Sequence, residues 1–272
     1  MNEFLTRANN RSTYSALEQI FRSKGNYLIL GYGYIGSQND AMDKKLNDLF
    51  CVINEELINN KNLFVEIHLG LLVDWSKVDK SYISSNLCYK KKFAIFYNVF
   101  KTQIDSKFKQ LGEFNFEESV KRRIKVYGIP NFHAKYSLMV DNCDSFSPIS
   151  GMMGSSNLTK AALFDRGRLE LDLYMKGGES NELLNLFSKE VAEIREHNTG
   201  KKFASWSFDT NEFEVFESEE MKHYVESLEI LEHAREEMEL EDHLANQYSD
   251  CSKRDKEALL ESDRNQEISY GD

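Results

Sequence analysis

Long apolar runs are missing from this 272-residue chain, and proline and cysteine are scarce. A membrane-spanning helix needs about 18 consecutive apolar residues, and the sequence has no such stretch. Its first residues also lack the apolar segment of a signal peptide. We therefore expect a protein of the cytoplasm with no membrane partner. With 2 prolines the chain has no proline-rich linker, and no internal repeat is visible.

The 4 cysteines are far apart in the sequence, and none of them belongs to a C-x-x-C pair (Cys51, Cys88, Cys143 and Cys251). This spacing fits neither a zinc site nor a small scaffold stapled by disulfides. We expect four reduced thiols in a reducing compartment.

The net charge of -11 comes from one end of the chain. Residues 1–206 carry 28 basic and 24 acidic side chains, a balance of +4, whereas residues 207–272 carry 6 and 21, a balance of -15. The first part can therefore approach a polyanion, which the second part would repel.

Alternating strand-like and helix-like segments predict a layered α/β domain in residues 1–206. The expected strands are 26–30, 63–73, 123–129, 134–140 and 169–175, and the expected helices are 39–60, 87–111 and 180–197. Ser180 is the expected N-cap of the last helix. Residues 207–272 form a second, acidic region, with an amphipathic helix near 218–246 and a disordered end.

Two ionisable side chains, His133 and Lys135, stand two residues apart in an expected strand and so share one face. An imidazole beside an ammonium is unfavourable in a core, because each buried charge needs a partner. The pair suits a phosphate, since lysine neutralises oxyanion charge and histidine can attack phosphorus or transfer a proton. On its own, an H-x-K in a strand is more often a surface pair.

Small polar residues follow at 154–157, between an apolar run and the helix-like segment 158–163. Their hydroxyl, amide and backbone N–H groups can converge on an anion. Strand alternation then puts Glu170 and Asp172 on one face, where a carboxylate can hold a histidine in its reactive tautomer. Each feature alone indicates only a turn or an exposed strand residue, but the three in this order predict a site for a phosphate group.

Together, F-H-A-K-Y, G-S-S-N-L-T and the later glutamate resemble the hallmark motif of the phospholipase D superfamily, and in particular its bacterial nuclease and restriction-endonuclease-like branch. The resemblance covers about residues 20–200 and implies a mixed β-sheet layered between helices. The full family pattern has an aspartate five residues after the lysine, where this chain has Val140 followed by Asp141. Members of the nuclease branch often lack that aspartate, so the departure favours this branch. Whether Asp141 or Asp172 contributes stays open.

The resemblance implies a role for each motif residue. His133 would be the nucleophile that forms a phosphohistidine, and Glu170 would orient it. Lys135 and Asn157 would bind the non-bridging oxygens of the phosphate. No metal or other cofactor would be needed, because lysine and amide donors stabilise the charge. Further candidates for substrate contacts are Ser155, Ser156, Tyr34 and Ser37.

A single copy of the motif is present, whereas the chemistry of the family uses two histidines, one to attack and one to protonate the leaving group. The resemblance therefore implies a homodimer with the site at its two-fold interface. None of the other histidines has a lysine two residues later (His68, His197, His223, His233 and His243). Of these, His68 in an expected buried strand is kept as a spare candidate.

The basic clusters favour a nucleic acid, DNA above all, as the phosphodiester (residues 90–92, and Lys121, Arg122 and Arg123). We therefore interpret the chain as a metal-independent DNA endonuclease of a restriction or anti-phage defence type. One alternative is a phospholipase or phosphatidyltransferase, although no basic amphipathic helix points to a membrane surface. Another is a catalytically silent, nucleic-acid-binding subunit of a larger complex.

The acidic region has three possible roles. It can be a solvated, disordered end, it can cover a basic cleft, or it can dock a helicase, an ATPase or another subunit of a defence system.

Gly31, Gly33 and Gly36 form a G-x-G-x-x-G pattern after the first expected strand. A dinucleotide site needs a helix that begins within this pattern and an acid about 20 residues later, at the end of the next strand. The next strand begins near residue 63, and its acid, Glu66, stands in mid-strand. The pattern is therefore a poor fit to a dinucleotide site. In the superfamily that the chain resembles, the first strand also ends in a Gly-Tyr-containing turn beside the active site, so the resemblance implies that the glycines form one wall of the phosphate pocket.

Overall fold

The computed structural model describes residues 1–5, 12–36, 44–71, 111–112, 114–130, 132–159, 162–163, 170–199, 204–210 and 212–215. Contacts divide the chain into two units, Met1–Lys222 and His223–Asp272, and all the described residues belong to the first. The expected acidic helix near 218–246 and the expected helix 87–111, apart from its last residue, lie outside the described residues, as do residues 90–92.

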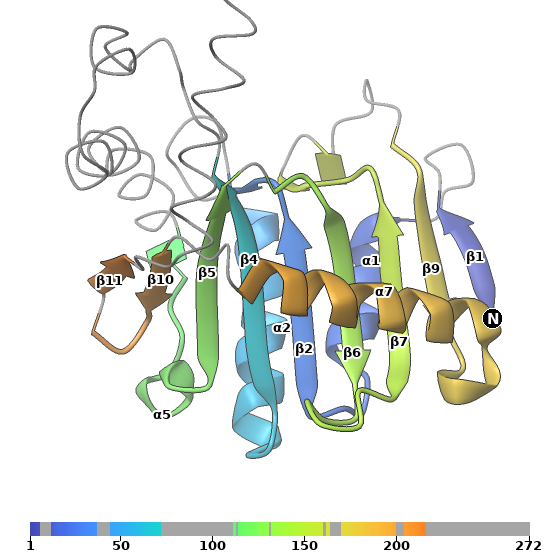
Figure 1. The fold of residues 1–272 in the computed structure, drawn as a ribbon. Coiled ribbons are helices and arrows are strands. Elements are labelled where there is room, and N and C mark those ends of the chain that lie inside the picture. The colour runs from blue at the N-terminus through green and yellow to red at the C-terminus, as the bar shows by residue number, and fades with distance from the viewer. Residues whose placement is uncertain are drawn as a thin grey trace, which may run out of the picture. The chain divides into compact units, whose positions relative to one another are not determined.

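A nine-stranded mixed β-sheet forms the centre of the first unit (Figure 1). Its strands are β1 (Asn2–Leu5), β2 (Tyr27–Tyr32), β4 (Phe64–Leu71), β5 (Ile124–Pro130), β6 (Lys135–Val140), β7 (Pro148–Gly154), β9 (Asp172–Lys176), β10 (Ala204–Ser207) and β11 (Glu212–Val215). They lie in the order β1-β9-β7-β6-β2-β4-β5-β10-β11. The pairs β2–β4 and β4–β5 are parallel, and the other pairs are antiparallel.

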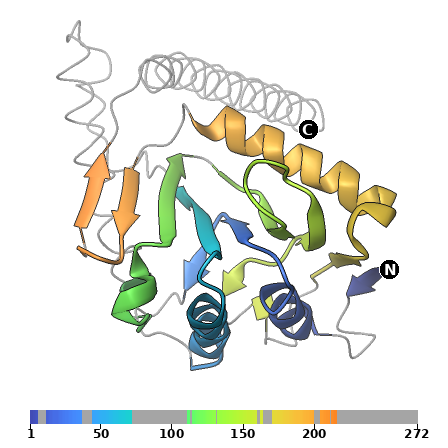
Figure 2. The same cartoon turned by 90° about the horizontal axis from the view of Figure 1, so that it is seen from below.

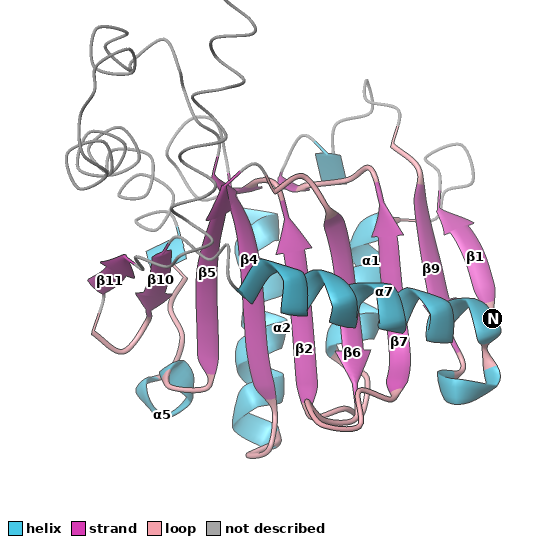
Figure 3. Ribbon diagram, in the orientation of Figure 1, coloured by secondary structure: helices cyan, strands magenta, loops and turns pink. Residues whose placement is uncertain are grey.

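Helices cover both faces of this sheet (Figures 2 and 3). On one face lie α1 (Thr13–Phe21) and α2 (Lys44–Asn59), and on the other lies α7 (Glu182–Thr199). Short helical segments precede β5 and α7, namely α5 (Glu118–Lys121) and the 3-10 helix η3 (Gly178–Ser180). The expected α/β fold with a mixed sheet between helices is thereby confirmed.

The alternation of side chains along β2 shows why the sheet takes helices on both faces. Tyr27 and Ile29 belong to the apolar cluster that includes Leu184, Phe187 and Val191 of α7. The intervening residues of β2, at 28 and 30, are also buried, and successive residues of a strand point to opposite faces. A strand that is apolar at every position fits a sheet covered on both sides.

The expected strands and helices in the described regions are present, with ends shifted by a few residues. The N-cap of α7 was predicted wrongly. The helix begins at Glu182, and Oδ1 of Asn181 accepts a hydrogen bond from N of Leu184 at 3.2 Å, so Asn181 is the N-cap. Ser180 instead ends η3, and its hydroxyl donates to the carbonyl oxygen of Gly177.

Several helices and strands of the structure are not predicted by the sequence patterns. These are β1, α1, α5, β7, β10, β11 and the two-stranded sheet of β3 (Ile35–Gly36) and β8 (Leu158–Thr159). Because β10 and β11 join the main sheet, the strand-paired part of the chain extends to Val215, beyond the boundary expected at residue 206. None of the helices in the described ranges is long and apolar enough to cross a membrane.

Candidate functional site

The motif residues collect at one edge of the sheet, the upper edge in Figure 1. Strands β2, β4, β5 and β7 end there, and β6 and β9 begin there, because β6 and β9 run antiparallel to their neighbours. Register pairs Tyr32 with Lys135 and Gly154 with Asp172. Segments that are far apart in the sequence are thus neighbours, as the motif requires.

His133 is exposed, whereas the residues on either side of it are packed into the core. Phe132 is buried and Ala134 half-buried, and both belong to the cluster that includes Tyr136 of β6. Alternate residues from 132 onward therefore point toward α7, and His133 points the other way. The strand itself begins only at Lys135, so His133 lies just before β6 rather than within it.

Lys135 bends back onto the segment that carries the histidine. Its Nζ donates a hydrogen bond of 2.5 Å to the carbonyl oxygen of His133. In the part of the chain that the structure describes, no acidic side chain pairs with Lys135. Its positive charge therefore stands next to His133 without a carboxylate to neutralise it, as binding of a phosphate oxygen needs.

Asn157 is held by the glycine-containing loop that follows β2. Its Oδ1 accepts a hydrogen bond of 3.1 Å from the backbone N of Tyr34. The amide oxygen is thereby used, and the Nδ2 donors have no hydrogen-bond partner among the described residues, so they are available to a ligand. A Cβ atom on Gly33 would lie 3.2 Å from the carbonyl oxygen of Phe132, 3.5 Å from Cα of His133 and 3.6 Å from Oδ1 of Asn157, so this loop lies close to both motif segments.

The two-stranded sheet of β3 and β8 pairs the loop that follows β2 with the residues that follow the G-S-S-N turn. Ile35 pairs with Leu158 and Gly36 with Thr159, in parallel. The last glycine of G-x-G-x-x-G therefore lies in a strand, where a dinucleotide site would have a helix. Residues 158–159 likewise form a strand rather than the expected start of a helix.

Glu170 lies just before β9 and contacts the serine of the other motif segment. Its Oε2 accepts a hydrogen bond of 2.5 Å from Oγ of Ser155, and that Oγ accepts one of 3.0 Å from N of Leu171. Among the described residues, the structure shows no hydrogen bond between Glu170 and His133. The orienting role expected for Glu170 therefore stays a prediction, and what the structure shows is that Glu170 and Ser155 are bonded.

Buried hydrogen bonds between Asp172 and Ser156 hold the G-S-S-N turn in place. Asp172 is 1% exposed and accepts hydrogen bonds from N and Oγ of Ser156, at 3.1 and 2.6 Å. It also accepts one of 2.7 Å from Oγ1 of Thr13, at the start of α1. Ser156 is buried as well, so its hydroxyl faces Asp172 rather than the open edge. No local sequence pattern links Thr13 to Asp172, because 159 residues separate them.

Asp141, which was left open as a motif residue, shapes the turn between β6 and β7. Its carboxylate accepts hydrogen bonds from the hydroxyl of Ser145 and from the backbone N of Asn142 and Ser147. Burial acts to raise its pKa, but these hydrogen bonds outweigh that effect and lower it. Asp141 follows the end of β6 and is therefore at the edge opposite to His133.

The basic cluster before β5 also lies at the opposite edge. The sequence predicts that it contacts the substrate, but β5, which separates it from the edge with His133, has seven residues and so places its two ends roughly 20 Å apart. Arg123 donates to the carbonyl oxygens of Leu57, Asn60 and Leu63, and thereby caps the C-terminal end of α2. Burial lowers the pKa of its guanidinium.

The other two cations of this cluster have acidic partners. Nζ of Lys121 donates to Glu118 at 2.7 Å, and Nε of Arg122 donates to Asp209 at 3.0 Å. The side chain of Arg122 is 82% exposed, so a polyanion can still reach it. This cluster can therefore contact the substrate only if the nucleic acid is long enough to reach from the sheet edge that carries His133 to the opposite edge.

His68, the spare candidate, is fully buried. Its Nε2 lies 2.6 Å from Oε1 of Glu66, and its Nδ1 lies 3.1 Å from the hydroxyl of Tyr136. With both ring nitrogens engaged and no exposed surface, His68 cannot attack a substrate in this arrangement. Ser37 lies outside the described residues.

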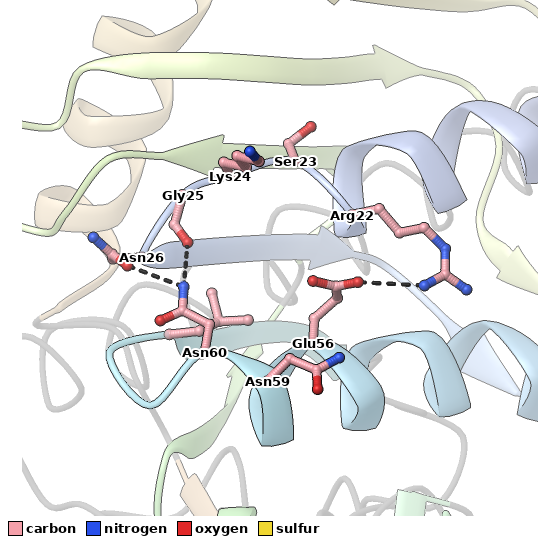
Figure 4. A pocket seen from close by; sticks show the side chains of 9 residues that line it. Arg22, Ser23, Lys24, Gly25, Asn26, Glu56, Asn59 and Asn60 are labelled. Atoms are coloured by element: carbon pink, nitrogen blue, oxygen red, sulfur yellow. Dashed lines mark hydrogen bonds and ion pairs between the residues drawn. The ribbon is translucent and has the colours of Figure 1, made fainter.

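A polar pocket of ≈ 320 Å³ lies at the opposite edge, where α1 ends and β2 begins (Figure 4). Arg22 pairs there with Glu56 and with two further carboxylates. Nδ2 of Asn60 donates to the carbonyl oxygen of Gly25 and to Oδ1 of Asn26. These groups satisfy one another, so the pocket belongs to the scaffold. In the described ranges, no group of three or more His, Cys, Asp and Glu side chains could hold a metal ion.

No protein-family model matches the chain, and no curated protein does so either. Among solved structures the chain is similar to a phospholipase D family member, Nuc from Salmonella typhimurium. The TM-score is 0.40 and the identity 10%, over 74% of this chain and 95% of that one. For NucT from Helicobacter pylori the TM-score is 0.39 and the identity 12%, over 72% and 96%.

A phosphatidylserine synthase from Haemophilus influenzae gives a TM-score of 0.41 and 17% identity, over 87% of this chain and 46% of that one. These values describe a distant likeness, so we base the function on the motif residues themselves. In its H-x-K, G-S-S-N and Glu170 motif the chain resembles the phospholipase D family.

Proposed function

We propose that the chain is a metal-independent phosphodiesterase that cleaves DNA through a covalent phosphohistidine. The observation that supports this most is the meeting of three motif segments at one sheet edge. An exposed imidazole stands there beside a lysine that has no acidic partner among the described residues, and beside an amide whose oxygen is already bonded. A nucleophile and donors that stabilise charge are the two requirements of phosphoryl transfer without a metal.

In the proposed first step, a ring nitrogen of His133 attacks phosphorus, and the bond from phosphorus to the leaving oxygen breaks. The ammonium of Lys135 and the Nδ2 donors of Asn157 bind the non-bridging oxygens, where negative charge increases in the transition state. A proton must reach the leaving oxygen. In the second step water attacks the phosphohistidine and gives its proton to the group that protonated the leaving oxygen, and the bond between phosphorus and nitrogen breaks, which releases the phosphate end and restores His133.

The leaving-group proton needs a second acid, which leads us to propose a homodimer. The histidines among the described side chains are His133, which attacks, and His68, which is buried. In the proposal, His133 of a second copy supplies the proton, so each complete site contains two chains. One surface that could take part lies beside Ser155 and carries three exposed apolar side chains, Met153, Leu171 and Phe4.

Mixed dimers test this proposal. Wild-type chains and His133→Ala chains are co-expressed in equal amounts with different tags, so that they assemble at random. A site built from two chains retains about a quarter of the activity of the all-wild-type protein, whereas independent sites retain about half. Purified dimers carrying both tags are expected to be inactive. Half-active mixed dimers, or a monomer that cleaves DNA, would contradict the shared site.

The substrate class is tested with wild-type protein and excess EDTA. Single-stranded DNA, double-stranded DNA, RNA and phosphatidylcholine vesicles are incubated separately, and product formation is followed over time. We expect DNA to be cleaved at the same rate with and without EDTA, because lysine and amide donors stabilise the charge in the transition state.

Other results identify the alternatives. Loss of cleavage in EDTA overturns the metal-independent mechanism, and hydrolysis of lipid with intact DNA supports a phospholipase. DNA binding without cleavage of any substrate supports a silent binding subunit. A role in restriction or phage defence, and docking of a helicase or ATPase through residues 207–272, remain further parts of the proposal for a DNA endonuclease.

A further inference from the structure

The residue before His133 is held on several sides by other buried groups. The ring of Phe132 meets His68 edge-on, with centroids 6.1 Å apart, and meets Tyr136 in the same way at 6.2 Å. Its carbonyl oxygen lies against Gly70 of β4, where any Cβ atom would collide with it. Edge-to-face aromatic pairs at such separations are attractive, so both contacts stabilise one position of Phe132.

His68 itself cannot turn, because both of its ring nitrogens are bonded. With the proton on Nε2, it donates to Oε1 of Glu66 at 2.6 Å and accepts from the hydroxyl of Tyr136 at 3.1 Å. These two partners come from β4 and β6. A ring rotation would leave buried polar atoms without partners, which costs about 1–3 kcal/mol for each.

Glu66 joins this group to β2 and to α7. Oε2 of Glu66 accepts from the hydroxyl of Tyr27 at 2.5 Å, and Oε1 accepts from Nε of Arg195 at 3.2 Å. Arg195 also donates to the Tyr27 hydroxyl at 3.1 Å, and its guanidinium carbon lies 5.3 Å from the centre of the Tyr27 ring. Glu66 is 3% exposed, so a carboxylate paired in this way is well ordered.

We infer that Phe132 and His68 are positioning residues for His133. The buried network of Glu66, Tyr27, Arg195 and Tyr136 fixes His68, which fixes Phe132, and Phe132 sets the backbone from which the His133 side chain projects. The inference rests on the proposed role of His133 as nucleophile. Its physical basis is that a displacement of about 1 Å in a reacting group can lower the rate about 100-fold.

The test replaces Phe132 with leucine, which keeps the site apolar and removes the ring edges. Phe132→Leu is expected to lower kcat for DNA cleavage about 10- to 100-fold and to change KM by less than about threefold, because binding groups remain in place. Phe132→Tyr retains the ring and should restore most of kcat. His68→Leu is expected to act like Phe132→Leu, although it leaves Glu66 with one hydrogen bond fewer.

Phe116→Leu is the matched control. Phe116 is 4% exposed and lies edge-to-face on Phe208 with centroids 4.8 Å apart, and its ring contacts among the described residues are with Phe50, Phe114 and Phe208 rather than with the His133 segment. Both leucine variants lose a buried ring with its aromatic pairs, so both should lose similar stability in urea unfolding. A similar loss of kcat in both would overturn the inference, because it would indicate a general effect of stability.

A second readout does not depend on cleavage. The ring signals of His133 in histidine-labelled protein are assigned by their absence from His133→Ala. We expect Phe132→Leu to shift or broaden these signals, and Phe116→Leu to leave them unchanged. Unchanged signals in Phe132→Leu overturn the inference. If the signals move but wild-type protein cleaves no phosphodiester, the positioning stands and the proposed function fails.

Discussion

Replacement of His133 by alanine is expected to lower the rate of DNA cleavage by a factor of about 10⁴ or more, because it removes the nucleophile on which both steps depend. Binding should change much less, since Lys135 and Asn157 keep their contacts with the loop and backbone. Stability should hardly change, because the His133 side chain is exposed. Single-turnover cleavage and urea unfolding measure these effects.

The covalent intermediate gives a second measurement of the same prediction. Wild-type protein quenched in alkali during cleavage should carry labelled DNA in an acid-labile, alkali-stable bond, as a phosphohistidine does. His133→Ala should carry none. Lys24→Ala serves as the control, because Lys24 is exposed and lies by the pocket at the opposite edge (Figure 4). Cleavage or covalent labelling that persists in His133→Ala would remove His133 from the mechanism.

Replacement of Glu66 by glutamine is expected to lower the free energy of unfolding by about 3 kcal/mol at neutral pH. The change removes the negative charge that pairs with Arg195 and accepts from His68 and Tyr27. Loss of one partner of a buried pair leaves the other without compensation, which typically costs about 3–5 kcal/mol. Arg195 is 31% exposed, so water offsets part of this cost.

The same variant should change how stability depends on acid. Burial acts to raise the pKa of Glu66, but the hydrogen bonds of His68 and Tyr27 and the charge of Arg195 hold it far below its usual value. A carboxyl group with a lowered folded-state pKa stabilises the fold above its unfolded pKa of about 4.3, and this stabilisation is lost as the pH falls. The difference between wild type and Glu66→Gln should therefore shrink from about pH 5 downward.

Urea unfolding at several pH values between 3 and 7, roughly the window set by that lowered pKa, measures this difference. Glu56→Gln is the matched control, because Glu56 pairs with Arg22 at the surface, where such pairs contribute about 0–1 kcal/mol. If Glu66→Gln loses no more stability than Glu56→Gln, the network under Phe132 is not a major source of stability. A constant difference across the pH range would contradict the lowered pKa.

Much of the fold was predictable because its strands and helices have strong periodicity. The residues of β2 are apolar or aromatic at every position except Gly31, which indicates a sheet covered on both faces, whereas β4 also carries the buried Glu66 and His68. The short elements were not predictable. β3, β8 and β10 have two to four residues each, and they form strands because their partners are nearby rather than because of their own sequence.

The sequence by itself determined which residue types the candidate site contains. H-x-K, G-S-S-N and a later acid occur in the order that the family resemblance requires, and the same spacing argued against a dinucleotide site. Residues 132–140 are apolar or aromatic at every even-numbered position, and in the structure these side chains belong to the core cluster or pack against it, whereas His133 is exposed.

Tertiary structure alone decided where these groups are and what they contact. The length of β5 puts Lys121, Arg122 and Arg123 at the far edge, and Arg123 caps α2 there. The pairing of β2 with β6 and of β7 with β9 brings the three motif segments to one edge, with the Gly33–Tyr34 loop between His133 and Asn157. The contact of Tyr34 with Asn157 joins residues 123 positions apart, and no local pattern encodes it because it depends on strand order and register.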